Sequence, residues 1–539
     1  MRKVLGIIAS AAFTTALLAA CTGGARQDES PRSDPPETYA AETHAMQRAR
    51  LAALEVAAFS APPLPQEPLS AEVYAPFDDN GVRLAATDPV STFSIDVDTG
   101  SYANVRRWLN QGRLPPEDAV RVEEMINYFD YAYARPRDRG RPFSVSTTLS
   151  RAPWNADAHL LRIAIQGYDI DARERPPANL VFLVDVSGSM DAPDKLPLLK
   201  RGLALLVDRM TANDRLSLVV YAGASGIVLE PTPGDRKAEI RAAIEALQPG
   251  GMTNGASGIR LAYELARQAF IEDGINRVIL ATDGDFNVGT VNFEELIDLV
   301  ERGRESGVAL TTLGFGSGNY NDRLMEQLAD KGNGNHAYID TLNEARKVLV
   351  EEMSSTLLTI AADVKAQIEF NPAVVAEYRL IGYENRLLAR EDFNNDKVDA
   401  GDIGAGHSVT VLYEIALTDS AARRVDALRY QPAAAPPGMQ DELAWLKLRY
   451  KLPGETASRL IEQAIRRDSE VALAATDDDF RFAAAVAAFG QKLRGGRYLG
   501  GFDYGEIREL AADARGRDAH GYRGEFLRLV GLAESLQSR

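Results

Sequence analysis

The stretch that most constrains this chain is "NLVFLVDVSGSMDAPDK", residues 179–195. Five apolar residues, 180–184, run without a break into Asp185, and Ser187 and Ser189 follow at intervals of two. An unbroken apolar run that ends in turn residues is typical of a strand buried on both faces of a parallel sheet. Because such sheets bind ligands at the carboxyl ends of their strands, we expect the acid and the two hydroxyls to line a site.

The residues that follow alternate apolar strands with amphipathic helices. This alternation over 178–357 predicts an α/β, Rossmann-like domain with a mostly parallel sheet covered on both faces. The predicted strands are "RLSLVVYA", "RVILATDG", "VALTTLGFG" and "HAYID", and the predicted helices cover 194–210, 235–247, 257–271, 293–306, 322–330 and 342–357.

Two further polar positions fall near the same edge of the predicted sheet. The loop "GGMTNG" places Thr253 before a helix, and "LATDGD" places Asp283 after a strand. With Asp185, Ser187 and Ser189 they form a set of two carboxylates and three hydroxyls without His or Cys. Such hard oxygen ligands suit Mg²⁺, Mn²⁺ or Ca²⁺ and do not suit zinc. The sequence therefore predicts a metal site at these five residues.

"DVSGS", Thr253 and the Asp of "TDG" resemble the metal-ion-dependent adhesion site of the von Willebrand factor type A (VWA) domain. The whole chain also resembles bacterial VWA-domain lipoproteins with a family-specific N-terminal segment and a C-terminal domain of unknown function. The stretches most specific to that resemblance are "FSIDVDTGSYANVRRWLNQG" and "DFNNDKVDAGDIGAGHSVTVLYEI". The resemblance implies a bound Mg²⁺ that captures an Asp or Glu side chain of a partner protein.

The N-terminus has the features of a secretory signal. Arg2 and Lys3 precede an almost wholly apolar or small stretch, and "LLAAC" ends at Cys21, the only cysteine of the chain. This stretch resembles the lipobox of bacterial lipoproteins, which implies a signal peptide over 1–20 and a lipid on Cys21. Thr22 in place of Asp implies the outer membrane, facing the periplasm or the cell surface. The alternative is a plain signal peptide with an incidental thiol.

Residues 21–87 are rich in Pro and Ala and are expected to form a tether, interrupted by a helical stretch over 43–59. A formal net charge of −17 argues against nucleic acid and anionic lipid headgroups as the main partner. Attachment to a membrane is therefore expected through the N-terminal lipid.

Strand-like alternation flanks the VWA segment on both sides. "PFSVSTTLS" and "HLLRIAIQGYDI" lie in an N-terminal region, 88–177, which begins with helices; "ADVKAQIEF", "AEYRLIGYE", "HSVTVLYEIAL" and "LAWLKLRYKL" lie in 358–453. Because two strands alone are marginal in water, we expect both sets to form one β-sandwich that carries the VWA domain as an insertion. Residues 454–539, including "IEQAIRRD", are predicted to be helical.

Two acidic stretches have alternative interpretations. Asp96, Asp98 and Thr99 loosely resemble the DxDxT nucleophile of aspartate-based phosphatases, but a cap or turn is favoured, with Thr99 or Ser101 capping a helix. Asp392, Asn394 and Asp396 resemble a calcium loop and are a second candidate cation site. A solvated acidic hairpin turn is favoured there, because Ile403 stands where the twelfth-position carboxylate belongs.

The sequence thus favours a membrane-anchored, metal-dependent adhesion or scaffolding module of the cell envelope, and not an enzyme. Its expected partner is an envelope or surface protein that presents Asp or Glu. One alternative is an envelope hydrolase that uses the same ion, although no general base is evident. The other is a structural envelope protein with a vestigial site. The five histidines are far apart in sequence and are expected to be structural.

Overall fold

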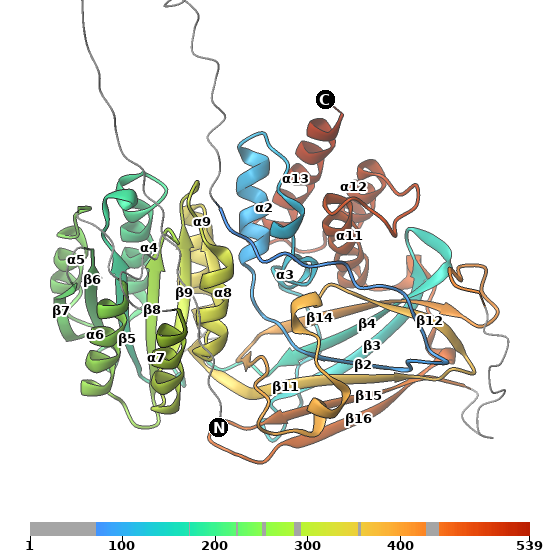
Figure 1. Cartoon of the computed structure of the whole chain (residues 1–539), viewed down its shortest axis with the longest axis horizontal. Helices are drawn as coiled ribbons and strands as arrows, with labels where there is room; N and C mark the ends of the chain where they lie inside the picture. The colour runs from blue at the N-terminus through green and yellow to red at the C-terminus, as the bar shows by residue number, and fades with distance from the viewer. Residues whose placement is uncertain are drawn as a thin grey trace, which may run out of the picture. The chain divides into compact units, whose positions relative to one another are not determined.

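The computed structural model describes residues 72–538 except 172, 223–224, 251–254, 285–292, 354–356 and 427–440. From residue 69 onward the chain forms one compact unit. An α/β domain lies beside a β-sandwich, and helices cover one face of the sandwich (Figure 1). Among the described residues, no helix combines the length and the apolar character needed to cross a membrane.

The α/β domain contains a six-stranded sheet in the order β10-β9-β8-β5-β6-β7. All neighbours are parallel except β7, which runs antiparallel to β6 at one edge. Strand β7 was not predicted from the sequence, because its two prolines argue against a strand in the interior of a sheet. They are tolerated here because β7 lies at the edge. The strands are β5 (Ala178–Asp185), β6 (Arg215–Tyr221), β7 (Ser225–Pro233), β8 (Ile275–Thr282), β9 (Ala309–Phe315) and β10 (His336–Ile339).

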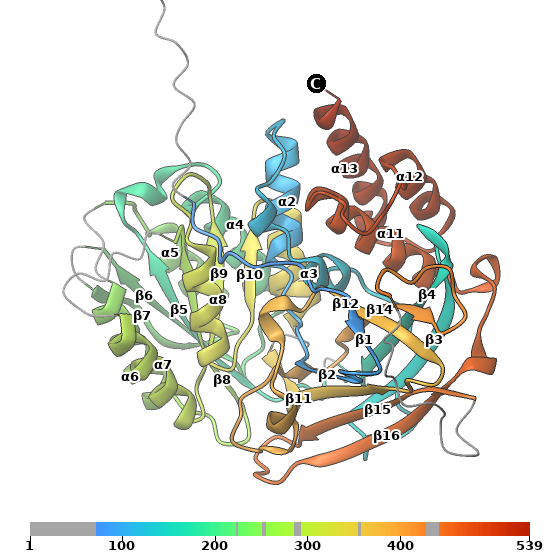
Figure 2. The same cartoon turned by 45° about the vertical axis from the view of Figure 1, so that its right-hand side comes forward.

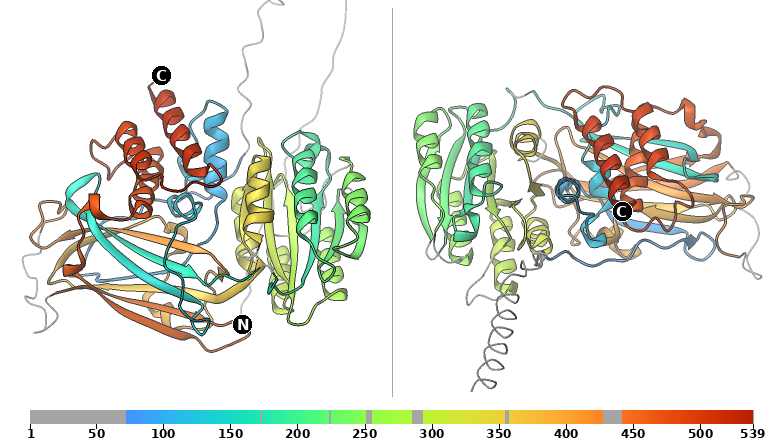
Figure 3. Two further views of the ribbon diagram at one scale, coloured as in Figure 1. Left: turned by 180° about the vertical axis from the view of Figure 1, so that it is seen from behind. Right: turned by 90° about the horizontal axis from the view of Figure 1, so that it is seen from above.

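Helices cover both faces of this sheet, as the view from above shows (Figure 3). Two separate hydrophobic clusters result, one with Leu199 and Ile240 and the other with Tyr263 and Met325. The predicted parallel α/β domain is therefore confirmed. Its helices are α4 (Leu196–Arg209), α5 (Lys237–Glu245), α6 (Gly255–Gln268), α7 (Phe293–Glu305), α8 (Asp322–Lys331) and α9 (Leu342–Arg346), the last continuing into a π-helical turn (Lys347–Glu351).

The sandwich is built from strands on both sides of the α/β segment. Strand β4 pairs with β14 in an antiparallel register that runs from Gln166↔Ser408 to His159↔Ile415. The first sheet has the order β1-β12-β14-β4-β3; the second has β13-β11-β15-β16, with β2 also paired to β11. Residues such as Phe93, Leu161 and Phe370 fill the space between the sheets.

The α/β domain is thus inserted between β4 of one sheet and β11 of the other, as the discontinuous-sandwich hypothesis predicted. The strands of the sandwich are β1 (Arg83–Leu84), β2 (Val90–Ser94), β3 (Phe143–Ala152), β4 (Asn155–Gly167), β11 (Thr359–Phe370), β12 (Val375–Ile381), β13 (Ile403–Gly404), β14 (Ser408–Leu417), β15 (Glu442–Lys451) and β16 (Arg459–Arg466).

A layer of helices covers the outer face of the first sheet (Figure 2). Residues of β4, β12 and β14, such as Leu160, Ile381 and Leu412, share a buried cluster with Phe482 and Phe526 of the helices. Helix α2 also contacts β10, so this layer links the sandwich to the α/β domain. The helices are α2 (Gly100–Asn110), α3 (Val122–Asn127), α11 (Asp478–Leu493), α12 (Tyr504–Asp513) and α13 (Tyr522–Gln537).

One sequence-based prediction in these regions is wrong, and a second is confirmed only in part. "IEQAIRRD" is not helical, because most of it forms β16, which pairs along its length with β15 and gains backbone hydrogen bonds there. Thr99 occupies the N-cap position of α2 but makes no side-chain cap bond, and Ser101 lies inside the helix. The Ser101 backbone N–H instead donates to Glu124 of α3 at 2.7 Å. A backbone N–H in the first turn of α2 is thus satisfied by the Glu124 carboxylate and not by a side chain at the N-cap position.

Candidate metal centre

Asp185 is the last residue of β5, which lies between β6 and β8 in the middle of the sheet. Its Oδ1 accepts a hydrogen bond from the Ser187 backbone N–H at 2.8 Å. Its Oδ2 accepts from the hydroxyls of Thr282 at 2.9 Å and Tyr221 at 3.3 Å. Burial raises the pKa of Asp185, and these neutral donors and nearby Asp283 modify that effect. The carboxyl group is therefore fixed in place on both of its oxygens.

The two serines lie directly beyond this carboxylate. A 3₁₀ turn over Gly188–Asp191 brings the Ser187 and Ser189 hydroxyl oxygens to 3.0 Å from each other. The backbone of the loop is held by Gly250 N–H, which donates to the Val186 carbonyl at 2.7 Å. The loop therefore points both hydroxyls to one side, as their spacing of two residues predicted.

Asp283 follows β8, the strand that pairs in parallel with β5. Its side chain is completely buried. Lys195 Nζ donates to Asp283 Oδ2 at 2.8 Å, and Asn319 Nδ2 donates to the same oxygen at 3.4 Å. The lysine was not singled out in the sequence, because one lysine beyond a serine loop has no recognisable signature of its own.

The structure brings together four of the five predicted ligands: Asp185, Ser187, Ser189 and Asp283. Thr253 lies outside the described residues. Within the described ranges, no group of three or more His, Cys, Asp or Glu is arranged to hold a metal. A cation here would therefore depend on two carboxylates and on hydroxyl oxygens. That donor set fits a hard ion such as Mg²⁺.

The second candidate cation site does not assemble. Asn394 Oδ1 accepts from Arg449 at 3.0 Å, and Asp396 Oδ1 accepts from the Ser458 hydroxyl at 2.6 Å. With Asp392, they lie in the long connection between β12 and β14, and this connection packs on the second sheet of the sandwich. The favoured prediction of a solvated hairpin turn holds only in part: Asn394 is exposed, but the connection contains a 3₁₀ turn over Arg390–Asn394 and buries Phe393.

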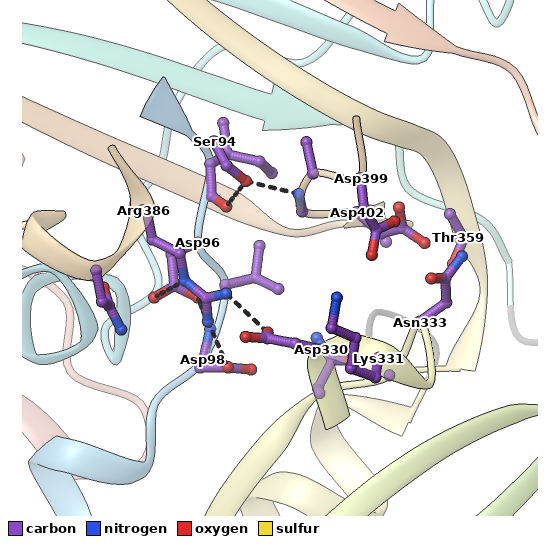
Figure 4. Close-up of a pocket in the computed structure, with 18 of the residues that line it drawn as sticks. Ser94, Asp96, Asp98, Asp330, Lys331, Asn333, Thr359, Arg386, Asp399 and Asp402 are labelled. Atoms are coloured by element: carbon purple, nitrogen blue, oxygen red, sulfur yellow. Dashed lines mark hydrogen bonds and ion pairs between the residues drawn. The ribbon is translucent and has the colours of Figure 1, made fainter. Parts of the chain in front are cut away.

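Asp96 and Asp98 have a structural arrangement. Arg386 lies between them, with Nε 3.3 Å from Asp96 Oδ2 and Nη2 3.2 Å from Asp98 Oδ2, and Nη1 contacts Asp330 at 2.7 Å (Figure 4). Asp98 Oδ1 also accepts the His336 backbone N–H at 2.8 Å. These contacts join the N-terminal segment, the α/β domain and the sandwich beside a cavity of about 230 Å³. The geometry favours the structural interpretation over a phosphatase nucleophile.

Cys21 and the helical stretch over 43–59 lie outside the described residues. Of the histidines, His336 is fully buried and hydrogen-bonded to Tyr320 and Thr312. His407 is placed where burial lowers its pKa to about 4. Both arrangements agree with structural roles.

The parallel sheet, with an acid and two hydroxyls at its edge, defines a VWA-domain protein. The family described as "von Willebrand factor type A domain" matches residues 179–352, and the family described as "von Willebrand factor" matches 68–162. VWA domains commonly mediate protein–protein interaction, so this coarse function applies to the chain. The family described as "Uncharacterized protein YfbK, C-terminal" matches 355–536. The chain belongs to the YfbK family of bacterial VWA-domain proteins.

The relative that shows this membership is "Uncharacterized protein YfbK" of Escherichia coli. It is 50% identical over 471 residues, which cover 86% of this chain and 81% of the relative. "Uncharacterized protein sll0103" of Synechocystis is 32% identical over 204 residues, covering 37% of this chain and 47% of that protein. The solved structure "von Willebrand factor type A from Catenulispora acidiphila" is 16% identical with a TM-score of 0.39, covering 72% of this chain and 89% of that one.

Proposed function

We propose that this chain is a membrane-anchored, metal-dependent protein-binding module. Asp185, Ser187, Ser189, Thr253 and Asp283 would hold Mg²⁺, or Mn²⁺ or Ca²⁺, at the edge of the sheet. When bound, the ion would supply a local positive charge to which an Asp or Glu side chain of a partner can bind. The expected partner is an envelope or surface protein.

One observation carries this proposal. Asp185 is fully buried, both of its oxygens are held by neutral donors, and no ion pair involves it among the described residues. A buried carboxylate without a cationic partner is costly unless a metal or a proton neutralises it. The two serine hydroxyls, 3.0 Å apart, add neutral oxygens beside it without adding charge.

The hydroxyls also explain how an acidic protein can bind an acidic partner. Ser187 and Ser189 donate no negative charge, so a cation held by them and by Asp185 keeps most of its own charge. The formal net charge of −17 belongs to the whole chain, whereas a bound divalent ion would dominate the potential within its own site. Without such an ion, a protein with this net negative charge would repel acidic partners and bind them poorly.

The test is a calorimetric titration of the full-length chain with Mg²⁺ and with Mn²⁺. Wild type is compared with Asp185→Ala and with the control Glu264→Gln, which removes an exposed charge from α6 of the same domain. We expect binding in wild type and in the control, and none in Asp185→Ala. Capture of a partner from envelope extract should then be lost with EDTA and with Asp185→Ala. Equal metal binding by all three proteins would contradict the proposal.

The membrane anchor is a separate part of the proposal and rests on the sequence around Cys21. Labelling with radioactive palmitate in a bacterial host should mark the wild-type chain, and the label should disappear in Cys21→Ser. Fractionation of the membranes would then place the labelled protein in the inner or the outer membrane. Unlabelled wild type in the soluble fraction would contradict the anchor and leave the metal site to be judged by calorimetry.

A further inference from the structure

Lys195 is a buried part of the candidate metal centre, alongside the predicted ligands. Its Nζ lies 2.8 Å from Asp283 Oδ2, and the side chains of the two residues are 8% and 0% exposed. Lys195 stands at the N-cap of α4, so the start of a helix fixes its backbone. The lysine is therefore a fixed internal cation at the same edge of the sheet as Asp185.

The surroundings form a slot for the lysine side chain. Gly316, which follows β9, has a φ of +72°, and a Cβ atom there would overlap Cγ, Cδ and Cε of Lys195. Asn319 borders the slot, with Oδ1 3.5 Å from Lys195 Nζ and Nδ2 3.4 Å from Asp283 Oδ2. The absence of a side chain at Gly316 is what lets the lysine reach Asp283.

The two carboxylates of the site therefore differ in the charge of the groups that donate to them. Asp185 is held by Ser187, Thr282 and Tyr221, which are all neutral donors. Asp283 is held by an ammonium group at ion-pair distance. To a cation at the serine loop, Asp185 therefore offers a full negative charge, whereas the negative charge of Asp283 is already offset.

We infer that Lys195 is a resident counter-cation that withholds the charge of Asp283 from the bound metal. This inference rests on the proposed function and specifies how the site is tuned. Lys195 would weaken the binding of the metal. It would also leave the ion with more uncompensated charge for a partner carboxylate than two free aspartates would allow. Lys195 is thus a positioning residue that sets the strength and the net charge of the site.

The test varies the local charge with three variants, compares them with wild type and one control variant, and measures the dissociation constant for Mg²⁺ alone by calorimetry on the full-length chain. Lys195→Met leaves Asp283 uncompensated and should bind Mg²⁺ at least tenfold more tightly than wild type. The double variant Lys195→Met/Asp283→Asn removes both charges and should bind within about threefold of wild type. Asp283→Asn leaves the lysine unopposed and should bind most weakly. Lys200→Met, on the same helix but paired with Glu245, is the matched control and should equal wild type.

The outcomes separate this inference from the proposed function. If wild type binds Mg²⁺ and Lys195→Met binds it equally or more weakly, the inference is overturned while the metal site stands. If Lys195→Met binds Mg²⁺ and wild type does not, the counter-cation is supported and metal binding by the natural protein is overturned. If none of the proteins binds, both proposals fail.

A metal-free readout covers the case in which Lys195→Met is too unstable to purify. The melting temperature without metal should fall in Lys195→Met and recover in the double variant, because the latter no longer buries a carboxylate that has lost its ion pair with the lysine. Asp283→Asn can then be compared with the double variant alone. The double variant should bind Mg²⁺ at least tenfold more tightly, and equal affinity would overturn the inference.

Discussion

Arg106 of helix α2 and Glu344 of helix α9 form an ion pair of 2.7 Å across 238 positions of the sequence. Arg106 is 2% exposed and also contacts Asp340 after β10 and Glu525 of α13. One guanidinium group therefore joins the segment before the VWA domain, the end of that domain and the C-terminal helices. Such a junction makes the position of the inserted domain sensitive to a single side chain.

Replacing Arg106 with Met should destabilise the fold by about 3–5 kcal/mol, because it leaves buried carboxylates without their counter-charge. Urea unfolding followed by circular dichroism measures the change. Arg83→Met is the control: its ion pair with Asp88 has a similar distance of 2.6 Å, but both side chains are about half exposed. That loss should cost about 0–1 kcal/mol. Equal losses in the two variants would show that the buried junction carries no special weight.

Asp402 predicts a pH dependence of stability. It lines the cavity beside Asp98 and Arg386, and burial raises its pKa to about 7. A carboxyl whose pKa is raised on folding stabilises the fold below its unfolded pKa, near pH 4, and that contribution is lost as the pH rises toward 7. Asp402→Asn should therefore gain stability over wild type between about pH 4 and 7, by roughly 4 kcal/mol at the upper end, since each unit of pKa difference is worth about 1.4 kcal/mol.

Unfolding by urea at several pH values tests this expectation. Glu369→Gln is the matched control, since it removes an exposed carboxyl from β11 of the same sandwich. Its stability difference from wild type should be flat over this range. A flat difference for Asp402→Asn as well would mean that the carboxyl ionises normally in the folded protein.

Alanine substitutions at Gly316 and Gly318 would distinguish the cost of steric overlap from the cost of backbone strain. Both have positive φ angles, +72° and +99°, but a Cβ atom at Gly316 meets Lys195 while one at Gly318 meets open space. Both alanine variants should lose about 1–2 kcal/mol from the left-handed backbone. Gly316→Ala should lose about 1–3 kcal/mol more from overpacking. Thermal unfolding of the two variants measures the difference, and identical melting temperatures would show that the lysine moves aside without cost.

Ser189→Ala should weaken Mg²⁺ binding by about tenfold, or about 1.4 kcal/mol, because it removes a neutral oxygen from the site. The fold should keep its melting temperature, since the Ser189 side chain is partly exposed. Ser225→Ala, in the edge strand β7, is the control and should bind Mg²⁺ as wild type does. Unchanged affinity in Ser189→Ala would remove this serine from the proposed ligand set.

The features that the sequence predicted well depend on local patterns. The apolar run before Asp185 predicted a buried parallel strand and a site at its end, and β5 has that form. The split sandwich was also predictable, because the two strands that precede the VWA segment would be only marginally stable without further partners. The pairing of β4 with β14 confirms that argument.

The errors arise where a distant partner decides the structure. "IEQAIRRD" contains good helix formers, yet the edge of β15 recruits most of it as β16. Arg386 lies 288 positions from Asp98, and Asn319 lies 124 positions from Lys195. No spacing rule connects residues so far apart. The contacts of Arg386 with the two aspartates and the slot that holds Lys195 therefore could not be predicted from the sequence.

The two connections of the VWA domain lead into different layers of the sandwich, β4 in the first sheet and β11 in the second. A mechanical pull on a partner held at Asp185 would therefore reach both sheets at once, through two attachment points instead of one. The buried packing between the sheets, including Leu161 and Phe370, would share that load. Two attachment points in different sheets would resist rotation of the VWA domain relative to the sandwich more than a single connection would.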